Sequence, residues 1–181
     1  FVAFLEAAGQ KLWQILPLGP TSYGDSPYQS FSTFAGNPYY IDLEALIREG
    51  YLTEEECEAV DYGSNPSYVD YEKIWLTRFK LLRKAYERAR EDGLLQEQDY
   101  LEFAKENQDW LADYALYMAV KSHFQYVCWV EWDEDIRLRK PGALKKYREE
   151  LAEEIGFYQF QQYLFASQWK ALKAYANEKG I

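Results

Sequence analysis

The sequence predicts an α/β protein that is predominantly helical. The apolar residues of segment 1–8 recur at the spacing of one helix face. The apolar run LWQIL at residues 12–16, bounded by Gly9 and Pro17, predicts a buried strand. Capped amphipathic segments fill most of the chain after residue 41. A helix, a short loop and a buried strand make one step of an α/β fold.

A long loop over residues 17–40 follows the predicted strand. Glycine and proline interrupt this stretch too often for a helix or a strand. Its six tyrosine and phenylalanine residues give it too much apolar surface for disorder. Ordered loops of this length are usually functional, and α/β barrels place their active sites directly after strands. We therefore expect the loop to carry the site.

Local signals predict where the following helices begin and end. Asp42 is expected to cap a short helix that ends at Gly50. Thr53 and Glu56 form the pattern of a capping box. Asp70 is expected to cap a long helix that stops near residue 93.

Two further helices are expected in the second half of the chain. One covers residues 109–126. The other begins with Pro141 in its first turn and continues without a break through Leu172. The middle of this last helix, residues 157–169, is apolar almost all round, so it should be buried on several sides.

Composition excludes several classes of partner. The net charge of −10 argues against nucleic acid, which requires a basic stripe. No run approaches the roughly 18 apolar residues of a membrane span, so no membrane partner is expected. The two cysteines, Cys57 and Cys128, do not make a disulfide framework and indicate reduced thiols in a cytoplasmic protein. There is no phosphate-binding glycine motif, and we expect no cofactor and no metal.

The densest polar and aromatic cluster lies at residues 21–30. Asp25 and Ser26 offer hydrogen bonds, while Tyr23 and Tyr28 offer flat rings. Rings to stack on and fixed polar groups suit a neutral ligand rich in hydroxyl groups. The alternative is a well-packed loop in which Asp25 and Ser26 bond only to their own backbone.

Other polar residues are interpreted more simply. His123 is the only histidine, and a packed or solvated side chain is the expected role. The acidic residues of segment 131–135 lack the spacing and the glycine of a calcium-binding loop.

The loop region resembles a known family. The stretches WQILPLGPT at 13–21, GDSPYQ at 24–29 and AGNP at 35–38 are similar to the signature of the amylomaltase-type 4-α-glucanotransferases, family 77 of the glycoside hydrolases. The similarity continues more thinly at 69–71, 113–116, 164–165 and 168–169. Ser22 departs from the family, in which many members have glycine, and no functional cost is expected.

This resemblance implies a fragment of a (β/α)8 TIM barrel. Residues 1–41 would supply a barrel helix end, a strand and the glucan-binding loop. Residues 42–140 would form a helical insertion subdomain, and residues 141–181 a long helix that returns to the barrel. We expect the chain to be cut from a larger enzyme, whose remainder is its partner, because no capping residue precedes the first helix.

The family transfers an α-1,4-glucan segment to an acceptor with retention, through a covalent glycosyl-enzyme. Its three catalytic carboxylates would lie beyond Ile181, so no catalytic residue is expected in this chain, and the chain alone should be inactive. The alternative is a non-catalytic α-glucan-binding module or a helical scaffold.

The resemblance also assigns binding residues for α-1,4-glucan oligosaccharides. Tyr28 matches the tyrosine that stacks on the sugar next to the scissile bond, and Ser26 and Asp25 precede it in the same loop. Tyr23 matches a tyrosine of a second glucan site. Trp75 falls near another aromatic residue of that second site, with an aromatic residue on the core face of a helix as the alternative.

Overall fold

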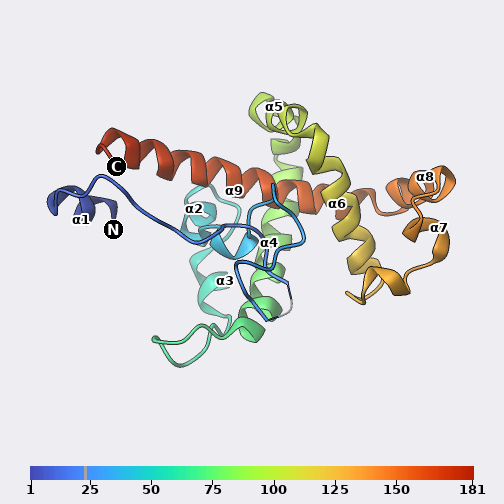
Figure 1. Cartoon of the computed structure of the whole chain (residues 1–181), viewed down its shortest axis with the longest axis horizontal. Helices are drawn as coiled ribbons and strands as arrows, with labels where there is room; N and C mark the ends of the chain where they lie inside the picture. Colours follow the sequence, from blue (N-terminus) through green and yellow to red (C-terminus); the bar gives the residue numbers. More distant parts are fainter. Residues whose placement is uncertain (23) are drawn as a thin grey trace. The chain divides into compact units, whose positions relative to one another are not determined.

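The computed structural model describes residues 1–22 and 24–181, and these residues are mostly helical (Figure 1). The helices are α1 (Val2–Ala7), α2 (Leu43–Arg48), α3 (Glu54–Glu58), α4 (Tyr71–Glu91), α5 (Gln98–Glu106), α6 (Gln108–His123), α7 (Glu134–Arg137), α8 (Pro141–Glu150) and α9 (Ala152–Glu178). Short 3-10 helices are η1 (Pro38–Tyr40), η2 (Leu94–Gln96) and η3 (Trp129–Glu131). The chain divides into two compact units, one of residues 1–78 and 164–181 and the other of residues 79–163.

The first unit contains α1, α2, α3 and the start of α4, and predicted caps mark the starts of the last three. The Asp42 side chain accepts a hydrogen bond from the Glu44 amide at 3.0 Å, which caps α2. Thr53 and Glu56 form both hydrogen bonds of the predicted capping box. Asp70 accepts from the Lys73 amide at 3.2 Å at the start of α4. These caps confirm the predicted starts, because each satisfies backbone donors that the first helical turn leaves free.

The prediction of a buried strand at residues 12–16 is wrong for this structure. The described residues contain only an isolated bridge between Thr21 and Ser30 and no strand. Leu12 is 88% exposed and Leu16 is 57% exposed. A strand forms by pairing with a neighbour, and the described residues offer residues 12–16 no such neighbour. An apolar pattern alone does not supply a partner strand.

The two ends of the chain lie together in the first unit (Figure 1). The Lys179 ammonium is 3.4 Å from the Glu6 carboxylate, which joins the residue after α9 to α1. Gly180 also lies beside Lys11.

The second unit is built around an apolar cluster of α6, α7, α8 and the segment between them. Its buried members are Leu116, Val120, Trp132, Ile136 and Tyr147. Leu144, Leu151 and Ile155 pack against this cluster.

The prediction of one unbroken helix from Pro141 to Leu172 is wrong at one position. Leu151 has φ −109° and ψ 22°, and it separates α8 from α9. No glycine or proline marks this break. Leu151 packs on the cluster of the second unit, and such tertiary packing outweighs the continuous helical pattern of the sequence. The buried middle of α9 is confirmed for Phe157, Tyr158 and residues 160–162 and 164.

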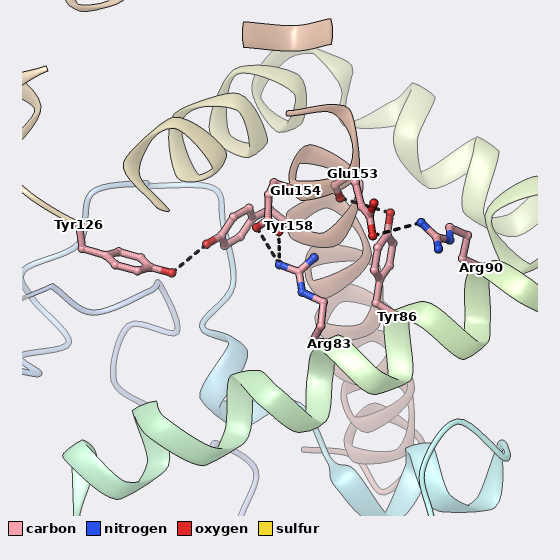
Figure 2. Close-up of polar contacts among 7 residues, drawn as sticks. All are labelled: Arg83, Tyr86, Arg90, Tyr126, Glu153, Glu154 and Tyr158. Carbon is pink, nitrogen blue, oxygen red and sulfur yellow. Dashed lines mark hydrogen bonds and ion pairs between the residues drawn. The ribbon is translucent and has the colours of Figure 1, made fainter. Parts of the chain in front are cut away.

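Within the second unit, α4 and α9 are joined by polar side chains (Figure 2). The Arg83 guanidinium donates to both carboxylate oxygens of Glu154, at 2.6 and 2.7 Å. The same guanidinium lies 3.6 Å from the centre of the Phe157 ring. The Tyr86 hydroxyl donates to the Glu153 carbonyl, and a Cβ at Gly156 would lie 2.4 Å from that hydroxyl oxygen. Gly156 therefore permits the close approach of the two helices.

Candidate functional site

The candidate site is the loop that leaves the extended segment at Leu18 and returns at Asn37. The Asn37 amide donates to the Leu18 carbonyl at 2.8 Å, so the two ends of the loop are directly bonded. Further along, Thr21 pairs with Ser30, and the Ser22 amide donates to the Gln29 carbonyl at 3.2 Å. Successive contacts therefore tie the two arms of the loop together up to its tip.

Two tight turns form the tip of this 18–37 loop. The Asp25 amide donates to the Ser22 carbonyl at 3.1 Å, and the Gln29 amide donates to the Ser26 carbonyl at 3.1 Å. Gly24 and Asp25 both adopt positive φ, at 90° and 54°. Glycine adopts this conformation freely, and aspartate is one of the few other residues that tolerates it. Asp25 therefore holds a backbone conformation that few residues other than glycine adopt, and such conformations are found more often at ligand-binding sites.

The ring of Tyr28 lies at the tip and is 76% exposed. The backbone amide of Tyr28 donates to Ser26 Oγ at 3.4 Å. The hydroxyl of Ser26 thus bonds to its own backbone, as expected for a packed loop, whereas the Tyr28 ring is not used for packing. An exposed aromatic ring held by a bonded turn is suited to stacking on the apolar face of a sugar.

Tyr39 lies two residues beyond the end of the 18–37 loop. Burial raises the pKa of Tyr39 to about 12, and the nearby negative charge of Asp25 adds to this rise. Tyr39 follows Asn37, whose buried side chain accepts from the Tyr39 amide at 3.0 Å and caps η1. The Tyr39 phenol therefore stays protonated near neutral pH.

Of the two residues assigned to a second glucan site, the structure describes only Trp75. Trp75 lies on α4, one turn after Tyr71, and is 39% exposed. The ring of Tyr71 is 6.1 Å from the ring of Tyr39, so the first turn of α4 lies beside η1, just after the loop. Tyr23 lies outside the described residues. The structure places Asp25, Ser26 and Tyr28 in the two consecutive turns of the tip, and Trp75 lies on α4, partly exposed.

Two residues that were not predicted as site residues hold the end of the loop. Arg78 on α4 donates to the carbonyls of Pro38 and Ile41, and Gln168 on α9 bonds to the backbone of Asp42. Residues 164–165 and 168–169 stood out only as a thin part of the family resemblance. Nothing in the local pattern around Arg78 indicated a contact with residues almost 40 positions earlier.

The remaining residues with reactive side chains are one histidine and two cysteines. His123 packs edge-on against the rings of Phe124 and Tyr147, in the second unit. Cys57 and Cys128 are free thiols. Within residues 1–22 and 24–181, no group of three or more histidine, cysteine or acidic side chains is arranged to hold a metal ion. No helix in the described part of the chain is long and apolar enough to cross a membrane.

Comparison with known proteins decides the family. The family model described as 4-alpha-glucanotransferase matches residues 1–181. The chain belongs to the 4-α-glucanotransferase family. A 4-alpha-glucanotransferase from Streptococcus pneumoniae is 51% identical over 182 residues, and one from Clostridium butyricum is 48% identical over 181 residues. Both alignments cover all of this chain, and they cover 36% and 37% of the two relatives.

A solved structure agrees with this assignment. The amylomaltase from Streptococcus agalactiae in complex with acarbose matches all of this chain with a TM-score of 0.94 and 41% identity. The match covers 36% of that amylomaltase. The chain therefore spans little more than a third of the length of these family members, and the resemblance noted in the loop is confirmed over the whole chain.

Proposed function

We propose that this chain is the glucan-binding part of a 4-α-glucanotransferase, which transfers an α-1,4-glucan segment to an acceptor glucose or maltodextrin. The observation that carries the proposal is the family match over all 181 residues, which includes the loop that presents Tyr28. The related transferases and the amylomaltase in complex with acarbose support an oligosaccharide as ligand. The cytoplasmic location remains part of the same proposal.

The proposed reaction proceeds with retention through a covalent glycosyl-enzyme. Two carboxylates about 5 Å apart can first form and then resolve such an intermediate. When an acceptor sugar takes the place of water in the second step, the outcome is transfer and not hydrolysis. These carboxylates belong to the part of the relatives that this chain does not cover, so the chain itself contributes binding and orientation.

Each residue of the loop has a proposed task. Tyr28 stacks on the sugar next to the scissile bond, because its ring is exposed at the ordered tip. Ser26 and Asp25 orient that sugar by hydrogen bonds. Tyr23 and Trp75 belong to a second site, which binds a more distant part of a long glucan.

The barrel proposal rests on an apolar groove in the first unit. The groove has a volume of about 860 Å³ and runs along residues 13–18, α2 and the last part of α9. Apolar side chains from these elements dominate its lining, among them Trp13, Leu16, Phe165 and Leu172. We propose that residues 12–16 become a barrel strand by pairing with other parts of the same polypeptide, which also fill the groove. The division at residues 41 and 140 belongs to this proposal.

The direct experiment uses maltotriose as the only sugar. The full-length protein that contains this chain should convert it into glucose and longer maltooligosaccharides, separated by chromatography. The 181-residue chain alone should give the same pattern as the blank, because it lacks the catalytic carboxylates. A folded full-length protein that produces no transfer products would refute the proposal, and transfer by the isolated chain would refute the assignment of the carboxylates.

A further inference from the structure

Gln168 forms a reciprocal pair of hydrogen bonds with the backbone at the end of the loop. Its Oε1 accepts from the Asp42 amide at 2.7 Å, and its Nε2 donates to the Asp42 carbonyl at 3.2 Å. Both the donor and the acceptor of one residue are thus bonded to one side chain of α9. Two bonds from a single amide fix the orientation of this backbone segment as well as its position.

Arg78 binds the same segment from α4. Its Nε donates to the Pro38 carbonyl at 3.3 Å, and a terminal nitrogen donates to the Ile41 carbonyl. Burial lowers the pKa of Arg78, although the neighbouring Tyr62 and Asp42 act in the opposite direction. The planar guanidinium matches two carbonyls that lie three residues apart, which a flexible lysine ammonium would not do.

Phe165 completes the contact from α9. A Cβ built on Gly36 would lie 2.0 Å from a ring carbon of Phe165, so the ring rests directly on the glycine backbone. Asn37, the next residue, is the one whose amide closes the loop on Leu18. The segment held by α4 and α9 is therefore bonded directly to the base of the 18–37 loop.

We propose that Gln168 and Arg78 are positioning residues for glucan transfer, which hold the base of the 18–37 loop so that its tip presents Tyr28 in one place. This inference rests on the proposed function. Neither side chain is assigned contact with the sugar. They act through residues 36–42, the closing bond to Leu18 and the contacts between the two arms of the loop.

A kinetic cycle in the full-length protein tests the inference. Gln168→Ala should lower kcat/KM for maltotriose by roughly 10- to 100-fold, because a shift of about 1 Å in a positioning group is enough for such a loss. In a Tyr28→Ala background, Gln168→Ala should lower kcat/KM by less than about threefold, because the ring that Gln168 positions is already absent. Gln168→Glu keeps the acceptor and loses the donor, so its effect should be intermediate. Lys170→Ala, an exposed change on the same helix, is the matched control and should be neutral.

Two results would overturn the inference: near-parental kcat/KM in Gln168→Ala, or a loss that is the same in both backgrounds. Amide hydrogen exchange reports on how firmly the loop is held and does not depend on enzyme activity. Gln168→Ala should speed the exchange of amides in residues 18–42 and leave α6 unchanged, and unchanged exchange in the loop would also refute the inference. If the parent protein shows no transfer, the proposed function fails, while the exchange experiment still decides whether Gln168 holds the loop.

Discussion

At the scale of single residues, the informative feature is the exposure of Tyr28. A large ring is normally buried, because covering it stabilises the fold by roughly 2 kcal/mol. Here the ring is 76% exposed, while the backbone around it is fixed by bonded turns. An ordered tip that leaves a ring in solvent favours a ligand-binding role over a packing role.

Replacing Tyr28 should separate stacking from hydrogen bonding. In the full-length protein, Tyr28→Ala should lower kcat/KM on maltotriose by roughly 30- to 1,000-fold, which corresponds to about 2–4 kcal/mol of lost transition-state stabilisation. Tyr28→Phe should be mild if stacking dominates, because the ring remains. Steady-state kinetics on maltotriose give both values, with circular dichroism to verify folding.

Tyr23→Ala provides the comparison from the same loop. Loss of a remote site should weaken the affinity for long glucans and have a smaller effect on maltotriose. Near-parental activity of a folded Tyr28→Ala protein would contradict the proposed role of the tip.

Gly36 should tolerate no side chain. Gly36→Ala places a methyl group 2.0 Å from the Phe165 ring, so the full-length protein should lose about 1–3 kcal/mol of stability through overpacking. Gly142→Ala is the control, since nothing lies within 4 Å of its added Cβ and it stands in the first turn of α8. Thermal unfolding compares the two. Equal midpoints for both variants would show that the contact with Phe165 is loose.

At the scale of elements, the sequence predicted what depends on near neighbours. The caps at Asp42, Thr53 and Asp70 each bond to an amide two or three residues away, so they are visible in the sequence itself. The break at Leu151 was not predicted, because no local signal marks it and Leu151 packs on the apolar cluster of the second unit. The strand predicted at 12–16 is absent for a related reason: strand formation requires a partner, and the described residues contain none.

The link between α4 and α9 in Figure 2 should be measurable as a coupling. Arg83→Ala should destabilise the full-length protein more than Glu154→Ala does, because it removes the stacking on Phe157 as well as the ion pair. The interaction of Arg83 with Glu154 should amount to about 1 kcal/mol, since both side chains are partly exposed. A double-mutant cycle on unfolding midpoints gives this value, and strictly additive effects would contradict the coupling.

At the scale of the whole molecule, the sequence predicted the loop but not the residues of α4 and α9 that hold it. Glycine, proline and tyrosine spacing marked residues 17–40 as an ordered functional segment, and the resemblance identified the family. Gln168 could not be connected to Asp42 in this way, because 126 residues separate them and each has an ordinary local context. Contacts of this kind depend on the fold, and no short sequence pattern predicts them.

The isolated chain should behave as an incomplete fold. Leu12, Ile15 and Leu16 are exposed beside the apolar groove, so the chain expressed alone should bind a hydrophobic dye and associate. Replacing Leu12 and Leu16 by Gln should reduce both effects. Light scattering and dye fluorescence measure them, and a monodisperse monomer that binds no dye would contradict the proposal that other parts of the polypeptide cover this surface.

The central claim is that these 181 residues supply the glucan-binding part of a 4-α-glucanotransferase. The most direct test is a chimaera in which they replace the aligned segment of the Streptococcus pneumoniae relative, which is 51% identical. We predict that the chimaera converts maltotriose into glucose and longer maltooligosaccharides, and that Tyr28→Ala within the transplanted segment removes most of this activity. A folded chimaera that shows no transfer, or one whose activity is unaffected by Tyr28→Ala, would contradict the account.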